Sequence, residues 1–117
     1  MNNTKIELEY EGEKYTLEYN IGTVKMLEAN GFNLNEFLTK PMTNIELAFQ
    51  GAFVKNHPKV SIATVDAIYK HCGDKAQLIA VLKKMIEETY EALFEDEEDE
   101  SKKVSWKTVD LAPKSTK

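Results

Sequence analysis

The feature that most constrains the fold is a long amphipathic stretch that runs from Asp74 to Phe94. Asp74, followed by Gln77, has the capping-box pattern of a helix start, and Gly73 suits the end of a preceding helix. Apolar residues recur at spacings of three and four, as on one face of an α-helix: Leu78, Leu82, Met85, Ile86, Tyr90 and Leu93. Such a helix needs packing partners, so we expect the upstream chain to cover its apolar face.

The N-terminal stretch has the alternation of a β-hairpin around Glu11-Gly12. Apolar residues occupy alternate positions on both sides of this pair: Ile6, Leu8, Tyr10, Tyr15, Leu17 and Tyr19. Pairing Tyr10 with Tyr15 leaves a four-residue loop, whereas pairing Leu8 with Tyr15 leaves a two-residue loop. Both registers keep the apolar side chains on one face, so the pattern leaves both open.

Two short helices are predicted after the hairpin. Asn20 is placed to cap the first, which Asn30-Gly31 ends in a left-handed turn with Phe32 as its apolar contact. Asn33 repeats the capping pattern for the second helix, and Pro41 is expected to stop it.

Two further helices are predicted before the long one. Thr43 and Glu46 form a capping-box pattern at the start of the first. The two hydrophobic-staple positions around that start are apolar: Met42 and Leu47. Gly51 has no side chain, so it favours close approach of another helix to this one. Ser61 then opens a helix that Gly73 is expected to close.

Composition indicates one soluble domain, with 42% hydrophobic and 30% charged residues in 117. The basic residues are all lysine, which argues against a nucleic-acid surface, where arginine is usually needed. The single Cys72 excludes an internal disulfide and suits a reducing compartment. Neither a signal peptide nor an apolar run long enough to span a membrane occurs, so we expect a cytoplasmic protein.

The C-terminal part changes character. Residues 95–100 are all acidic, and residues 101–117 carry five lysines and few apolar residues. We therefore expect residues 1–95 to form a hairpin-plus-helical domain and residues 96–117 to form a disordered, acidic-then-basic tail. Trp106, the only tryptophan, lies in this tail, which predicts a short linear binding segment.

No group of residues predicts a reaction. His71 and Cys72 are the one nucleophile–base pair to consider, but neighbours on a helix point in different directions. His57, His71 and Cys72 lack the spacing of a metal site, and the glycines are isolated. We expect no catalytic residue, no cofactor and no metal.

Six stretches, in their order and spacing, carry a resemblance to a known family: Ile6–Tyr19, Thr23–Glu28, Gly31–Asn33, Lys40–Thr43, Phe49–Phe53 and Asp99–Trp106. They resemble the tail assembly chaperones of long-tailed bacteriophages and of prophages of Gram-positive bacteria, which are encoded next to the tape-measure protein. The resemblance implies binding without chemistry: coating the helical tape-measure protein, keeping it soluble, and helping to recruit tail-tube subunits. From the composition we expect no nucleic-acid partner and no membrane partner, and a homo-oligomer is left open.

An uncovered groove that clamps an apolar helix would meet this role. The residues that we predict for partner binding are Phe49, Phe53, Met85, Phe94 and Trp106. The predicted fold is α+β and mostly α, with an N-terminal β-hairpin packed on about five helices and the tail after them. The alternative function is a small phage or bacterial regulatory protein whose acidic tail binds a basic surface of its partner.

Overall fold

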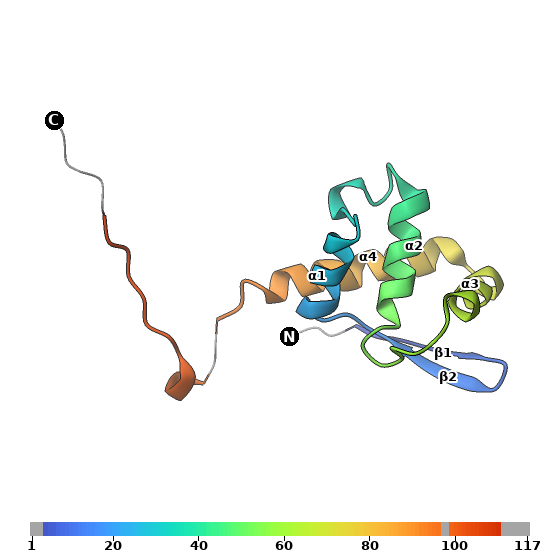
Figure 1. Cartoon of the computed structure of the whole chain (residues 1–117), viewed down its shortest axis with the longest axis horizontal. Coiled ribbons are helices and arrows are strands. Elements are labelled where there is room, and N and C mark those ends of the chain that lie inside the picture. Colours follow the sequence, from blue (N-terminus) through green and yellow to red (C-terminus); the bar gives the residue numbers. More distant parts are fainter. Residues whose placement is uncertain (1–3, 97–98, 111–117) are drawn as a thin grey trace.

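The computed structural model describes residues 4–96 and 99–110, which contain a β-hairpin, four α-helices and two 3₁₀ turns (Figure 1). In Figure 1 the long helix α4 (Lys75–Ala92) runs behind α1 (Ile21–Ala29) and α2 (Pro41–Ala52), and both of these helices contact it. The hairpin lies below the helices. The predicted fold class, mostly helical α+β with an N-terminal hairpin, is confirmed.

The hairpin resolves the register that the sequence left open. Strand β1 (Ile6–Tyr10) pairs antiparallel with β2 (Glu13–Leu17), and Leu8 lies opposite Tyr15. Glu11 and Gly12 form the two-residue loop with φ angles of +51° and +82°. Two left-handed residues give a turn whose twist matches that of the strands, so the tighter register is the one that forms.

Helix α1 begins and ends as the sequence predicted. Asn20 Oδ1 accepts from the Thr23 N–H at 2.8 Å, and Thr23 Oγ1 accepts from the Asn20 N–H at 2.9 Å. At the other end Gly31 has a φ of +102°, and the Phe32 N–H donates to the Leu27 carbonyl at 3.0 Å. This is the Schellman arrangement, and it turns Phe32 into the core.

Helix α2 begins at Pro41, so the prediction that Thr43 caps it is wrong. Lys40 occupies the N-cap position without a side-chain hydrogen bond. Proline is suited to the first helical position because its φ is already helical and its missing N–H would have had no partner there. With the start moved back, Met42 is 87% exposed and does not form the predicted hydrophobic staple.

A buried asparagine explains this earlier start. The predicted second short helix is a single 3₁₀ turn, Leu34–Glu36. Asn44 of α2 is 3% exposed; its side chain accepts from the Asn33 N–H at 2.9 Å and donates to the Glu36 carbonyl at 3.2 Å. These bonds fasten the loop to the first turn of α2, so Pro41 starts a helix rather than stopping one.

Ser61 and Asp74 cap the last two helices as predicted. Ser61 Oγ accepts from the Thr64 N–H at 3.1 Å at the start of α3 (Ile62–His71), and Asp74 Oδ1 accepts from the Gln77 N–H at 3.4 Å. Between them the left-handed residue is Asp74, with a φ of +48°, and not Gly73. Helix α3 thus closes without the left-handed glycine cap that the sequence suggested.

Helix α4 joins two clusters of buried side chains. Leu82 belongs to the cluster beneath the hairpin, whose members come from β2 and three helices: Leu17, Phe49, Ala52, Phe53, Val65, Ile68 and Leu82. Ile86 belongs to the cluster around α1: Val24, Leu27, Phe32, Phe37, Ala48 and Ile86. Tyr19 packs against both clusters, and its hydroxyl donates to the Ala48 carbonyl at 2.6 Å. The organising role predicted for the long helix is therefore met.

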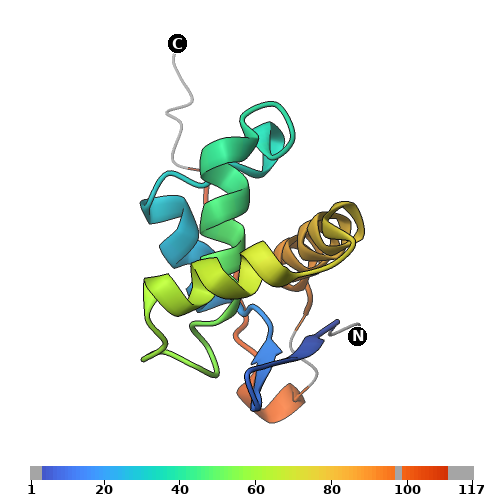
Figure 2. The ribbon, with the colours of Figure 1, turned by 90° about the vertical axis from the view of Figure 1, so that its right-hand side faces the viewer.

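Gly51 allows α1 and α2 to pack closely, as its sequence position predicted. A Cβ at this position would lie 2.5 Å from Leu27 Cδ2 of α1, closer than a real side chain tolerates. Figure 2 shows these helices side by side, with α3 crossing the lower end of α2.

The chain leaves the helices after Ala92, close to the predicted domain boundary at residue 95. Residues 101–110 are all exposed, and the longest dimension of the molecule, 68 Å, includes this arm, which points away from the helices in Figure 1. Part of the predicted disordered tail, residues 97–98 and 111–117, lies outside the described residues. The disorder predicted for residues 96–117 stays a prediction.

Candidate functional site

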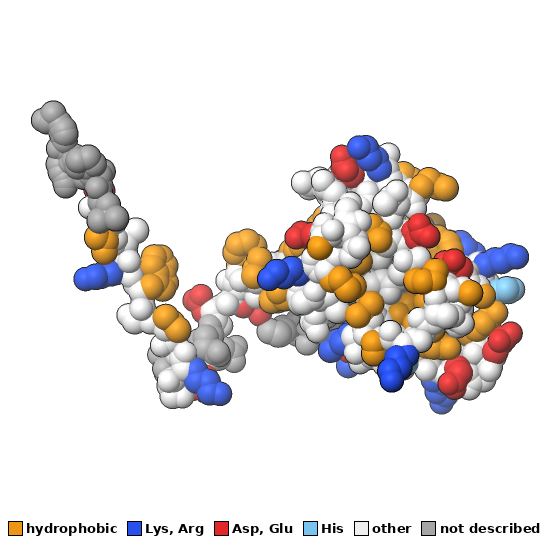
Figure 3. Space-filling model, in the orientation of Figure 1, with side chains coloured by type: hydrophobic (Ala, Val, Ile, Leu, Met, Phe, Trp, Pro, Cys, Tyr) orange, Lys and Arg blue, Asp and Glu red, His pale blue; other side chains and the backbone are white. Residues whose placement is uncertain are grey.

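The candidate site is an apolar groove between α2 and α3, which we call the α2–α3 groove. It has a volume of about 420 Å³. Its lining comes from one side of α2, from its first to its third turn, and from residues 65–70 of α3: Pro41, Met42, Ile45, Glu46, Phe49, Gln50, Val65, Asp66, Tyr69 and Lys70. Figure 3 shows hydrophobic side chains gathered over these two helices. The apolar positions recur every three to four residues, so each helix turns one stripe toward the groove.

The floor of the groove is part of the core. Phe49 is 2% exposed, and its ring lies 5.2 Å from that of Phe53 and 5.2 Å from that of Tyr69, edge to face in both cases. Val65 is buried beside them. Edge-to-face packing of this kind fixes the rings in place, so the floor is preformed.

The rim combines an exposed methionine with charged groups. Met42 is 87% exposed, although methionine is among the residues most often buried in folded proteins. Glu46, Asp66 and Lys70 line the same groove. An apolar channel with a polar rim is the form taken by grooves that accept an amphipathic helix.

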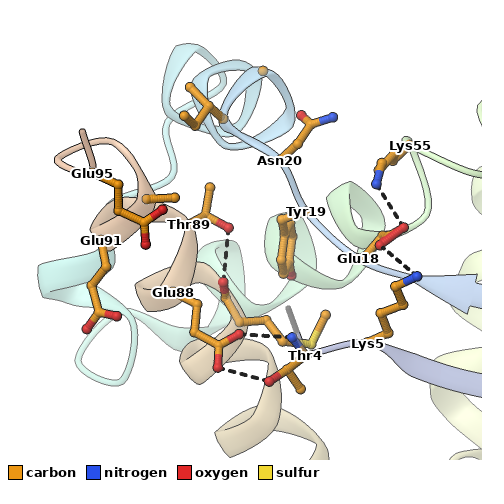
Figure 4. A pocket seen from close by; sticks show the side chains of 14 residues that line it. Thr4, Lys5, Glu18, Tyr19, Asn20, Lys55, Glu88, Thr89, Glu91 and Glu95 are labelled. Atoms are coloured by element: carbon orange, nitrogen blue, oxygen red, sulfur yellow. Dashed lines mark hydrogen bonds and ion pairs between the residues drawn. The ribbon is translucent and has the colours of Figure 1, made fainter. Parts of the chain in front are cut away.

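A second, larger cleft, which we call the polar cleft, has a volume of about 870 Å³. It lies between the start of β1, the α1 N-terminus and the last turns of α4 (Figure 4). Several of its polar groups bond to one another. Thr4 donates its N–H to Glu88 Oε1 at 3.1 Å and its hydroxyl to Glu88 Oε2 at 2.9 Å. These bonds tie the N-terminal strand to α4, so Glu88 acts within the fold.

Glu18 is the buried charge of this cleft. Its carboxylate accepts from Lys55 Nζ at 2.9 Å and from Asn56 Nδ2 at 3.2 Å, and Lys5 Nζ lies 3.7 Å away. The hydrogen bond from Lys55 outweighs the effect of burial and lowers the pKa of Glu18. Glu18 thus stays ionised, and it stabilises the fold by joining β2 to the segment after α2.

Comparison with known families assigns the chain. A family model described as a domain of unknown function, DUF5055, matches residues 1–110. The chain belongs to the DUF5055 family. No curated protein and no solved structure matches it. For this DUF5055 protein, the geometry of its own surfaces is therefore what supports a function.

The predicted partner-binding residues fall into three places in the DUF5055 domain. Phe49 and Phe53 lie together in the core, and only Phe49 reaches the α2–α3 groove. Met85 is 2% exposed and lies under the polar cleft instead. Phe94 and Trp106 are each 82% exposed, beyond the end of α4. The structure does not bring these residues into one groove.

Sequence reasoning missed the groove residues Met42, Ile45 and Tyr69. Met42 was interpreted as a staple residue, because Thr43 resembled a cap. The signal that would have found it is the spacing of Met42, Ile45 and Phe49, which forms one helical stripe once the helix starts at Pro41.

The candidate nucleophile lies in a setting that suppresses reactivity. Burial raises the pKa of the Cys72 thiol, which reduces its thiolate fraction. The neighbouring His71 Nδ1 contacts the Ala67 carbonyl at 2.8 Å, within its own helix. Within residues 4–96 and 99–110, no three His, Cys, Asp or Glu side chains are grouped to hold a metal ion, and no helix is long and apolar enough to cross a membrane.

Proposed function

We propose that this protein is a phage tail assembly chaperone that binds the tape-measure protein through the α2–α3 groove, in the host cytoplasm. The observation that carries the proposal is the apolar groove itself, with the exposed Met42 on its rim and Phe49 as its floor. The resemblance of the sequence to tail assembly chaperones gives the partner its identity. The groove is where we propose that this partner binds.

The chemistry of the groove suits a long apolar helix. An amphipathic helix lays one stripe of side chains into such a channel and leaves its polar side outside, where Glu46, Asp66 and Lys70 line the rim. A methionine on the rim adapts to different side chains, because it is unbranched and polarisable. A chaperone that must bind many sites along one extended partner needs this tolerance more than it needs high affinity.

Co-expression with the neighbouring tape-measure protein tests the proposal. The readout is the fraction of the tape-measure protein that stays soluble and co-purifies. M42K puts a charge on the rim of the groove, and we expect roughly a tenfold or greater loss of co-purification, since removing a charged group from water against an apolar partner is costly. I62K is the matched control, because Ile62 is 56% exposed on α3 and lies outside the groove lining.

The outcomes separate the two candidate functions. Retention by wild type and I62K with loss in M42K supports the chaperone. If M42K co-purifies as well as wild type, the groove is not the binding site. If no variant rescues the tape-measure protein, and removal of residues 95–117 abolishes binding to a basic partner, the regulatory alternative replaces the chaperone.

Recruitment of tail-tube subunits belongs to the same proposal and has its own readout. Purified complexes of this protein with the tape-measure protein are mixed with tail-tube protein, and co-sedimentation is measured. We expect co-sedimentation only when this protein is present, and an equal yield without it contradicts this part of the proposal.

A further inference from the structure

The outer edge of β1 is open. Because a two-residue loop pairs Tyr10 with Glu13, backbone hydrogen bonding to β2 alternates, and the N–H and C=O groups of Glu7 and Glu9 point away from β2. Within the described residues these groups make no hydrogen bond outside the hairpin. Such an edge is a template for another strand.

The outer edge of β2, by contrast, is covered. The Thr16 N–H donates to His57 Nε2 at 3.0 Å, and its carbonyl accepts from Asn56 Nδ2 at 3.2 Å. The Glu18 N–H donates to the Ala52 carbonyl at 3.0 Å. The fold therefore protects one edge of the hairpin and leaves the other available.

A hollow of about 280 Å³ lies beside the open edge, between β1 and the turn that joins α3 to α4. Its apolar lining comes from both sides: Ile6, Leu8, Tyr10, Ile68, Cys72 and Leu78. A strand added to β1 would place alternate side chains over this hollow, because successive residues of a strand point to opposite faces. The hollow therefore favours one large apolar side chain on the added strand.

The arm of the chain has the matching pattern. In residues 103–109, which are all exposed, Val104, Trp106 and Thr108 occupy one set of alternate positions. The other set contains two lysines, a serine and a valine: Lys103, Ser105, Lys107 and Val109. Strand β1 has apolar side chains on its inner face and exposed glutamates on its outer face. One face of the arm thus carries Trp106 and the other carries two lysines, as a match to the apolar and acidic faces of β1 requires.

We propose that residues 103–109 of one copy add to β1 of a second copy as a third strand. Trp106 fills the hollow, and on the other face one lysine of the arm lies opposite Glu7 or Glu9. We assign the arm to a second copy because it points away from its own domain (Figure 1). With the arm in this position, the longest dimension of the molecule is 68 Å. The contact joins an arm to an edge, so it closes by reciprocal exchange or extends head to tail. This self-association goes beyond the proposed chaperone function and needs no tape-measure protein.

The first test uses the natural tryptophan as the reporter in the purified full-length protein. Sedimentation velocity and Trp106 fluorescence are measured across a concentration series. We expect the average mass to rise with concentration and the emission to move to shorter wavelength with the same midpoint. A constant monomer mass overturns the proposal, and so does an emission shift that is independent of concentration, since that indicates docking within one chain.

The second test exchanges charges. E7K/E9K makes both edge and arm basic, and K103E/K107E makes both acidic, so each variant alone should associate about tenfold or more weakly than wild type. An equimolar mixture restores opposite charges at every contact and should recover wild-type association. Equal melting temperatures check that the folds are intact, since Glu7 and Glu9 are exposed. Failure of the mixture to associate, or full association of either variant alone, overturns the pairing.

Discussion

The polar cleft and the α2–α3 groove differ in how much of their lining already has a contact partner within the protein. The cleft is the larger, about 870 Å³ against 420 Å³, but Glu18 pairs with Lys5 and Lys55 within it, and Glu88 accepts two hydrogen bonds from Thr4. The groove leaves apolar side chains uncovered, including Met42 at 87% exposure. If volume alone were the criterion, the polar cleft would be taken as the binding site. The comparison teaches that an unsatisfied surface is a better sign of a binding site than a large one.

The same contrast separates stability from binding. Pairs such as Thr4 with Glu88 connect elements distant in sequence, so losing them should weaken the fold. The exposed rim of the groove contributes little to the fold, so changes there should affect a partner instead. Four substitutions test this division, and they are ordered by their expected effect on the free energy of unfolding.

The largest effect is expected for Phe49→Ala, because Phe49 belongs to both the core and the groove. Its ring contacts Phe53 and Tyr69 and is almost wholly buried. Truncation should lower the free energy of unfolding by about 3–5 kcal/mol. Urea unfolding measures the loss, with Phe94→Ala as the control, since Phe94 is 82% exposed. A loss below about 1 kcal/mol would mean that the groove floor is not core.

Glu18→Gln should have the next largest effect, on the polar cleft. It removes the charge that Lys55 and Lys5 share, and we expect a loss of about 1–2 kcal/mol at pH 7, because both lysines are partly exposed and solvent weakens the pairs. Urea unfolding of both proteins measures it.

The effect of Glu18→Gln should depend on pH. The pKa of Glu18 is lower in the folded protein than its usual value of 4.5, so the unfolded chain takes up the proton first. Its stabilising contribution is therefore complete above about pH 4.5 and is lost as the pH falls through the lower folded pKa. The difference between wild type and E18Q should shrink over that range. A difference that is constant from pH 7 to pH 3 would refute the assignment.

Thr4→Val should have a smaller effect. It removes the hydroxyl that donates to Glu88 Oε2 at 2.9 Å and keeps the N–H bond to Oε1 at 3.1 Å. One partly exposed hydrogen bond contributes about 0.5–1 kcal/mol. Thermal unfolding measures the loss. Since Thr4 acts through Glu88, the double variant with Glu88→Gln should lose less than the sum of the two single losses, and strict additivity would show that the pair is not coupled.

The parts of the fold that were predictable from the sequence are those set by neighbouring residues. The start of α1 at Asn20, the Schellman turn at Gly31 and the start of α4 after Asp74 each depend on hydrogen bonds within a few residues. The faces of the hairpin followed from alternation alone. Local rules sufficed there because the partner atoms lie close in the chain.

The errors occur where distant residues decide. The start of α2 depends on Asn44, which bonds to Asn33 eleven residues away, and no local pattern reveals that contact. The predicted partner-binding residues lie apart for the same reason: an apolar residue such as Met85 looks alike in sequence whether it is covered or open. Exposure is a property of packing, so Met42 emerged as a site residue only from the structure.

Met42→Lys should have the smallest effect on stability and the clearest meaning. Because Met42 is 87% exposed and makes no staple contact, we expect the free energy of unfolding to stay within about 0.5 kcal/mol of wild type. Urea unfolding measures it on the same preparation that is used for co-purification with the tape-measure protein. Unchanged stability with lost binding places the groove at the partner interface. A destabilisation comparable to that of Phe49→Ala would instead assign Met42 to the core. The contrast between the stabilising polar cleft and the binding α2–α3 groove would then no longer hold.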